Sequence, residues 1–168
     1  GIHISVLEHM NRSFSPSPLV VSVDCGITAV EAAQAAQAMG LELIITDHHE
    51  MLPGSLPEPS VLVHPRLAGS SYPFGDLCGA GVAFKLAWQF AKVHCGSDRV
   101  SDTFRALLLD LLCLAALGTV ADVVPLVDEN RVITAFGVGQ LKRTRFAGLN
   151  ALIDAANLRE TDIEAYHL

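Results

Sequence analysis

Two apolar, β-branched runs that each end in an aspartate constrain the fold of this chain most strongly. Residues 19–24 read Leu-Val-Val-Ser-Val-Asp, and residues 41–47 read Leu-Glu-Leu-Ile-Ile-Thr-Asp. Such runs are typical of buried strands in parallel sheets. An alanine-rich segment, residues 29–39, separates them and stops at Gly40, where a helix can end. We therefore expect a parallel β-α-β unit with a right-handed crossover.

The flanking segments extend this core. Residues 5–12 predict a short helix before the first strand, and residues 60–63 predict a third strand after a proline-rich loop. Thr28, followed by Glu31, has the spacing of a capping box at the start of the alanine-rich helix. Residues 1–77 are thus expected to form the sheet-containing part of the domain.

The second half of the chain, about residues 78–168, is predicted to be helical. Its apolar spacing indicates four helices, over residues 81–94, 103–117, 129–142 and 149–156. The second helix contains an apolar run, residues 106–117, which is shorter than the roughly 20 residues that span a bilayer. It therefore predicts a buried helix rather than a membrane anchor. Together these elements predict an α/β fold, a parallel sheet core flanked by helices, within one domain of 168 residues.

Composition and charge narrow the possible classes of protein. Hydrophobic residues make up 51% of the chain and charged residues 17%, which is too apolar for a disordered chain. The four cysteines form no C-x-x-C pair, and no secretion signal opens the chain, so we expect reduced thiols in a cytoplasmic protein. The net charge of −7 argues against a domain that grips nucleic acid by itself. Either the substrate is not a polyanion, or another part of the protein grips it. The acidity is also compatible with carboxylate metal ligands, or with an ordinary acidic surface.

Acids and histidines at the predicted strand ends form a candidate metal site. Asp24 ends the first run, Asp47 ends the second, and His48 and His49 follow directly. Ligands of open parallel sheets collect at the carboxyl ends of the strands. Carboxylate oxygen and imidazole nitrogen suit Mn²⁺ or Mg²⁺, and two such ions roughly 4 Å apart can activate water and clamp a phosphoryl group. The alternative is that Asp47 caps a turn and the histidines lie on the surface.

Asp122 is a further candidate ligand, in the segment Gly118-Thr-Val-Ala-Asp-Val-Val-Pro125. A carboxylate between apolar neighbours is costly unless it is paired or bound to a metal. The alternative for Asp122 is a capping role in the next turn.

Four residues are weaker candidates. Gly79 and Gly81 open a predicted helix and could offer backbone N–H groups to a phosphate, although close helix packing is the favoured explanation. Lys85 could reach a phosphate or pair with an acid. His64 ends the third strand near the predicted site, and a role other than metal ligand is favoured for it.

The ordered series of motifs resembles the DHH phosphoesterase superfamily. Within it, the series is similar to the bacterial RecJ branch, which comprises 5′→3′ exonucleases specific for single-stranded DNA. The residues that carry the resemblance are Val-Asp24-Cys-Gly-Ile, Asp47-His48-His49, Tyr72-Pro-Phe, Leu-Cys-Gly-Ala-Gly81-Val-Ala-Phe-Lys85, Gly-Thr-Val-Ala-Asp122-Val-Val-Pro and Glu129-Asn-Arg131.

The resemblance implies roles for individual residues. Asp24, His48 and Asp122 would ligate Mn²⁺ or Mg²⁺ in a two-metal site. His49 would face the scissile phosphate, and Asp47 would ligate or orient. It also implies hydrolysis of single-stranded DNA in DNA repair and recombination. Two alternatives remain open: a DHH phosphodiesterase for short oligonucleotides or cyclic dinucleotides, and a non-catalytic DHH scaffold module.

The chain also departs from the family pattern. Nothing here matches the Asp-x-Asp-x-Asp-Gly strand with which the family begins, or its later Pro-Arg-Ile-Asn-Ala-Gly-Arg stretch and DNA-binding domains. We therefore expect this chain to be an excised middle of the catalytic domain. Its two-metal site would then be incomplete, and it would contact single-stranded DNA only as part of the intact protein. Such a fragment is expected to be inactive by itself and to self-associate through exposed strand edges.

Overall fold

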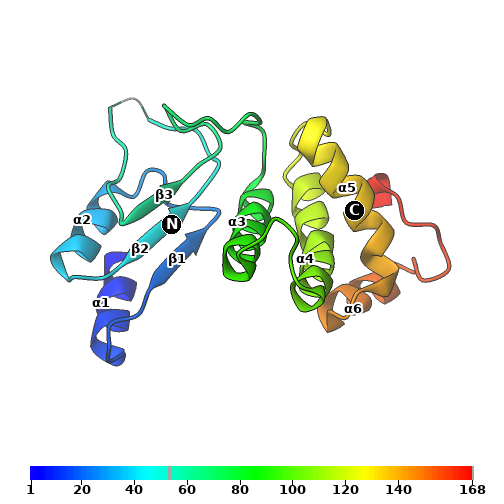
Figure 1. The fold of residues 1–168 in the computed structure, drawn as a ribbon, viewed down its shortest axis with the longest axis horizontal. Coiled ribbons are helices and arrows are strands. Elements are labelled where there is room, and N and C mark those ends of the chain that lie inside the picture. The colour runs from blue at the N-terminus through cyan, green and yellow to red at the C-terminus, as the bar shows by residue number, and fades with distance from the viewer. Residues whose placement is uncertain (53, 168) are drawn as a thin grey trace. The chain divides into compact units, whose positions relative to one another are not determined.

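The computed structural model describes residues 1–52 and 54–167. They form two compact units, Gly1–Gly75 and Asp76–Leu168. The first unit combines a parallel sheet with helices, and the described part of the second unit is helical (Figure 1). The predicted fold class, a parallel sheet flanked by helices with a helical second half, is confirmed.

Three parallel strands form the sheet of the first unit, in the order β1-β2-β3. Their bounds are Val20–Val23 for β1, Leu43–Thr46 for β2 and Val61–Val63 for β3. Each strand starts later than the sequence predicted, and β1 and β2 stop directly before the acids that end the two apolar runs. The carboxyl ends of all three strands therefore point to the edge at which the candidate site residues follow.

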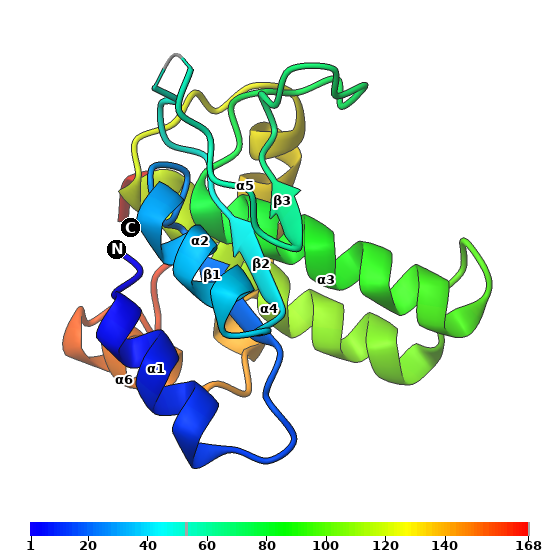
Figure 2. The same ribbon diagram turned by 90° about the vertical axis from the view of Figure 1, so that its left-hand side faces the viewer.

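Helix α2 (Val30–Ala38) covers one face of this sheet and helix α1 (Ile4–Ser13) packs against α2; Figure 2 shows α2 in front of the strands and α1 below it. The core beneath them consists of small and branched apolar side chains: Leu7, Ala32, Ala33, Ala36, Leu41, Leu43 and Ile45. Alanine has no side chain beyond Cβ, so α2 can lie close to β2. The predicted β-α-β unit is built on this contact.

The predicted capping box at the start of α2 is wrong. The N-cap is Ala29, and no side chain caps the helix. Backbone bonds close the turn instead, because the Ala29 N–H donates to the Gly26 carbonyl oxygen at 2.9 Å and the Val30 N–H donates to that of Thr28 at 3.0 Å. The residue before this turn, Ile27, is held by a side chain from β2, described below. The helix start is therefore set by backbone bonds within the turn and by this tertiary contact, rather than by a side-chain cap.

The second unit is built from four α-helices among its described residues: α3 (Gly79–Cys95), α4 (Asp102–Ala121), α5 (Asp128–Gln140) and α6 (Ala147–Ala155). Two short 3₁₀ helices follow α5 and α6, at Leu141–Arg143 and Ala165–His167. Helix α4 packs against both α3 and α5.

Helix α4 is longer than the sequence predicted. It continues past residue 117 to Ala121 and reaches 20 residues. Its length and apolar composition would by themselves allow it to cross a membrane. Only 22% of its apolar window is buried, and Leu107, Leu109 and Leu114 stay exposed, so the predicted burial of this helix is met only in part. The absence of a membrane partner stays a prediction.

Two glycines let the helices of the second unit approach closely. A Cβ at Gly118 in α4 would lie 2.6 Å from the Cβ of Ala80 in α3. A Cβ at Gly137 in α5 would overlap the Cβ of Ala116 and the carbonyl oxygen of Leu112 in α4. Close packing of buried atoms leaves no room for an extra methyl group at either position.

The contact between α4 and α5 can be tested with two substitutions in one helix. Gly137→Ala should lower the free energy of unfolding by about 2 kcal/mol, because overpacking outweighs the better helix propensity of alanine. Gly139→Ala is the matched control: no described atom lies within 4 Å of its added Cβ. It should raise stability by up to about 1 kcal/mol. Urea unfolding measures both, and a gain in stability for both variants would contradict the close approach.

Candidate metal centre

Three of the predicted site residues lie together at the carboxyl ends of β1 and β2. Asp24 follows β1, and His48 and His49 follow β2 by two and three residues. One potential ligand atom from each lies within 4.8 Å of the others. His48 Nε2 is 3.1 Å from Asp24 Oδ1. The pairing of neighbouring parallel strands thus brings together residues that are more than 20 positions apart in sequence.

The backbone at Asp24, directly after β1, has an unusual conformation. The Asp24 N–H still donates to the Thr46 carbonyl oxygen, at 3.0 Å, as a last rung of the ladder. Its φ of 61° is left-handed, which costs an L-residue roughly 1–2 kcal/mol but is tolerated best by Asp and Asn outside glycine. Gly26 has a φ of 120°, and a Cβ there would lie 2.9 Å from Ile45. The side chain of Asp24 ends 56% exposed, open to a ligand from solvent.

Asp47 is the buried acid of this site, with a side chain that is only 1% exposed. Its Oδ2 accepts a hydrogen bond from the Ile27 N–H at 2.8 Å, and its Oδ1 accepts one from the His48 N–H at 2.7 Å. Burial acts to raise the pKa of Asp47. The hydrogen bonds from Ile27, from the His49 side chain and from the backbone of His48 and His49 outweigh burial and hold that pKa below its usual range. An ionised carboxylate therefore joins the turn after β1 to the end of β2.

His49 is oriented by the same carboxylate. Its Nδ1 lies 2.6 Å from Asp47 Oδ1. An ionised carboxylate only accepts hydrogen bonds, so Nδ1 carries the proton and donates it. The ring is 57% exposed, so it can meet a substrate. Of the two roles considered for Asp47, this geometry favours orientation over direct ligation.

The donor set fits the metal that the resemblance implies. Asp24 offers a carboxylate oxygen, and His48 and His49 offer imidazole nitrogens, from side chains that already converge. Oxygen and imidazole donors of this kind suit Mn²⁺, and carboxylates suit Mg²⁺ as well.

Asp122 belongs to the second unit, where it directly follows α4. Its N–H donates to the Gly118 carbonyl oxygen at 2.9 Å. The next residue, Val123, has a φ of 56°, which is rare for a β-branched side chain. Backbone strain of this kind is typical of functional sites. The share of Asp122 in an ion site with Asp24 and His48 stays a prediction.

The weaker phosphate candidates lie in α3. Gly79 and Gly81 occupy its first turn, and the Gly81 N–H donates to Sγ of the N-cap residue, Cys78, at 3.3 Å. Lys85 Nζ pairs with Glu129 Oε1 at 3.0 Å. Of the two alternatives for Lys85, the structure shows pairing with an acid. Phosphate contacts by these three residues stay a prediction.

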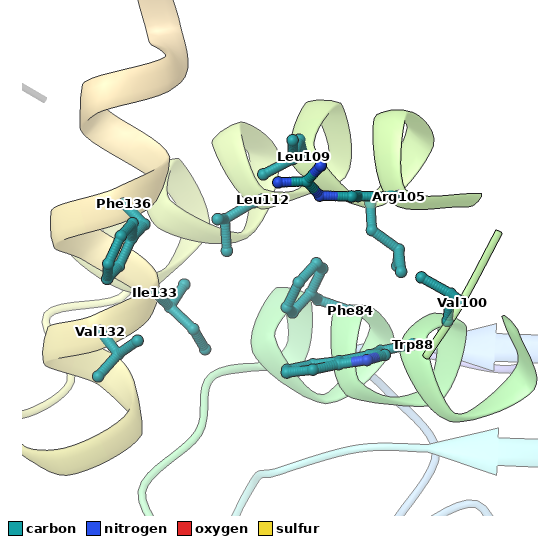
Figure 3. A pocket seen from close by; sticks show the side chains of 10 residues that line it. Phe84, Trp88, Val100, Arg105, Leu109, Leu112, Val132, Ile133 and Phe136 are labelled. Atoms are coloured by element: carbon teal, nitrogen blue, oxygen red, sulfur yellow. The ribbon is translucent and has the colours of Figure 1, made fainter. Parts of the chain in front are cut away.

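The second unit also holds an apolar pocket of about 270 Å³ (Figure 3). Helices α3, α4 and α5 line it, together with the segment that joins α3 to α4. Its lining is aliphatic and aromatic apart from one guanidinium: Phe84, Trp88, Val100, Arg105, Leu108, Leu109, Leu112, Val132, Ile133 and Phe136. No carboxylate or imidazole is among these residues, so this pocket lacks the ligands that a hard divalent ion requires.

A family model described as "DHH family, N-terminal domain" matches residues 3–116. The chain belongs to the DHH family. This confirms the family that the motif series around Asp47-His48-His49 predicted.

Within the DHH family, this chain is similar to RecJ proteins. It is 47% identical over 142 residues to the single-stranded-DNA-specific exonuclease RecJ of Bacillus subtilis, covering 84% of this chain and 16% of the relative. It is 37% identical over 143 residues to RecJ of Escherichia coli, covering 83% and 24%. The chain thus spans less than a quarter of either relative. The predicted resemblance to the RecJ branch is confirmed.

Solved structures of DHH relatives agree with this fold. An exonuclease RecJ bound to manganese matches with a TM-score of 0.72 and 33% identity, covering 98% of this chain and 39% of that one. RecJ from Thermus thermophilus in complex with Mn²⁺ matches with a TM-score of 0.76 and 30% identity, covering 98% and 23%. A complex of the same protein with Mg²⁺ matches with a TM-score of 0.58 and 30% identity, covering 90% and 19%. Both of the expected metals are therefore found in structural neighbours of this DHH chain.

The organising role of Asp47 in this DHH site can be measured as stability. Asp47→Asn replaces one acceptor oxygen with an amide that cannot accept a hydrogen bond, which leaves a buried N–H without its partner. The free energy of unfolding should fall by about 2 kcal/mol. Glu42→Gln, at an exposed carboxylate of the same unit, should change it by less than about 0.5 kcal/mol. Equal stability of the two variants would show that the Asp47 carboxylate does not hold the strand ends together.

Proposed function

We propose that this chain is the metal-holding part of a cytoplasmic 5′→3′ exonuclease that hydrolyses single-stranded DNA in DNA repair and recombination. The observation that carries the proposal is the convergence of Asp24, His48 and His49 at neighbouring strand ends. Similarity to RecJ exonucleases over most of this chain supports the choice of substrate.

Asp24, His48 and Asp122 would hold the metal, Mn²⁺ or Mg²⁺. When bound, such ions supply a water nucleophile at neutral pH and offset the negative charge of the phosphate. Asp24 and His48 already contact each other at 3.1 Å, so little side-chain movement is needed before they share a ligand. The first contribution of the protein is therefore a carboxylate and an imidazole fixed by the ends of two paired strands.

His49 would meet the scissile phosphate. Asp47 holds the His49 ring through Nδ1, which sets the orientation in which the ring would meet a phosphate oxygen. Asp47 thus acts through His49 rather than on the substrate.

Most of the affinity for DNA would come from parts of the full-length protein outside this chain. This chain carries a net charge of −7, whereas affinity for nucleic acid depends on Lys and Arg. It also covers only 16% of the Bacillus subtilis relative and 24% of the Escherichia coli one. Binding of single-stranded DNA and cleavage are therefore assigned to different parts of the molecule. The phosphate contacts predicted for Gly79, Gly81 and Lys85 would be secondary to that binding.

The experiment is an exonuclease assay on the full-length protein. We expect Mn²⁺-dependent release of mononucleotides from the 5′ end of single-stranded DNA, with duplex DNA largely resistant. Asp24→Asn should lower kcat/KM by more than about 100-fold, since it removes a ligand outright. Asp98→Asn, at a side chain that is 95% exposed, is the control and should leave kcat/KM unchanged.

Two results would contradict the proposal. Cleavage of cyclic dinucleotides with long single strands left intact would favour the alternative DHH phosphodiesterase. Full activity of Asp24→Asn would show that the metal is held by other residues.

A further inference from the structure

His64 is a buried histidine beside the candidate site that the proposed mechanism leaves without a role. It follows β3 directly and is only 5% exposed. Both of its ring nitrogens are engaged: the Arg66 N–H donates to Nδ1 at 3.1 Å, and Nε2 lies 2.9 Å from the carbonyl oxygen of His49. The two partners lie in the segments that follow β2 and β3, so the ring joins these two segments.

These two partners determine the tautomer of His64. A backbone N–H can only donate, so the Nδ1 that faces Arg66 is the bare, accepting nitrogen. A carbonyl oxygen can only accept, so the Nε2 that faces His49 carries the proton and donates it. The neutral ring with its proton on Nε2 therefore satisfies both contacts at once.

The contact with His49 continues strand pairing beyond the end of the ladder. The last backbone bond between β2 and β3 in this region runs from the Asp47 N–H to the Val63 carbonyl oxygen, at 3.1 Å. One residue after Val63, the side chain of His64 takes over and binds the carbonyl two residues after Asp47. The peptide that follows His49 is thereby tied to β3 by a side chain, where backbone pairing has stopped.

We infer that His64 is a positioning residue for His49, an inference that rests on the proposed function of this site. His49 is then fixed at two points: Asp47 holds its ring and His64 holds its carbonyl group. The segment after β3 makes a second contact with the same loop, because Arg66 donates to the carboxylate of Glu50 at 3.2 Å. With the main chain held, the hydrogen bond to Asp47 can set the rotation of the His49 ring.

Two conservative substitutions separate the two halves of the His64 interaction. His64→Gln places an amide N–H near the position of Nε2, so it keeps the donor to the His49 carbonyl and loses the acceptor for Arg66. His64→Asn places an amide oxygen near the position of Nδ1, so it keeps the acceptor and loses the donor. Each variant loses one hydrogen bond, and the two should show similar decreases in Tm.

Exonuclease assays on the full-length protein with Mn²⁺ and single-stranded DNA provide the first readout. His64→Asn should lower kcat about 10-fold with KM little changed, as expected when an outer partner of a site residue is lost. His64→Gln should keep kcat close to that of the unmodified protein. A purely structural role for His64 predicts equal losses for both variants, and that result would overturn the inference.

Crystal structures of the same three proteins provide a readout that does not depend on activity. The His49 carbonyl group should keep its place in His64→Gln and move in His64→Asn. An unmoved carbonyl in His64→Asn would overturn the inference even if the nuclease is active. If the unmodified protein releases no nucleotides, the proposed function fails, and the position of this carbonyl still decides whether His64 holds His49.

Discussion

One buried carboxylate, that of Asp47, holds two strand ends and the loop after each of them. Its two oxygens accept hydrogen bonds from the turn that follows β1 and from the residues that follow β2, and these bonds keep it ionised despite burial. The metal-binding candidates Asp24 and His48 lie in the two segments that Asp47 joins, and their side chains contact each other. A charge that would be costly in isolation thus becomes the fixed point of the site, because each of its oxygens has a donor.

The candidate site residues lie at the ends of well-packed strands and helices. The sheet of the first unit supplies strand ends, at which the side chains of Asp24 and His49 are more than half exposed and that of His48 is 13% exposed. The second unit is held by helices that touch through glycine and alanine, and it presents Asp122 at a strained helix end. In the proposed function, strain at Asp24 and Val123 is tolerated because paired strands and closely packed helices fix the neighbouring backbone.

Much of this architecture could be predicted from local patterns. The two β-branched runs predicted β1 and β2, and the rule that ligands gather at strand ends predicted that Asp24, His48 and His49 would meet. The capping box at Thr28 failed because the turn before α2 is fixed by Asp47, 20 residues away from Ile27. The bond from His64 to His49 spans 15 residues, so no local pattern reveals it. The role of Asp122 came from the family resemblance rather than from spacing, and it stays a prediction.

The central proposal is that Asp24 and His48 ligate a metal ion, with Asp122 as the predicted third ligand, and anomalous diffraction from crystals of the full-length protein soaked in Mn²⁺ tests it most directly. The account predicts an anomalous peak roughly 2–2.5 Å from a carboxylate oxygen of Asp24, a ring nitrogen of His48 and a carboxylate oxygen of Asp122. Manganese bound away from Asp24 and His48, or an Asp122 carboxylate on a different face of the domain, would contradict it.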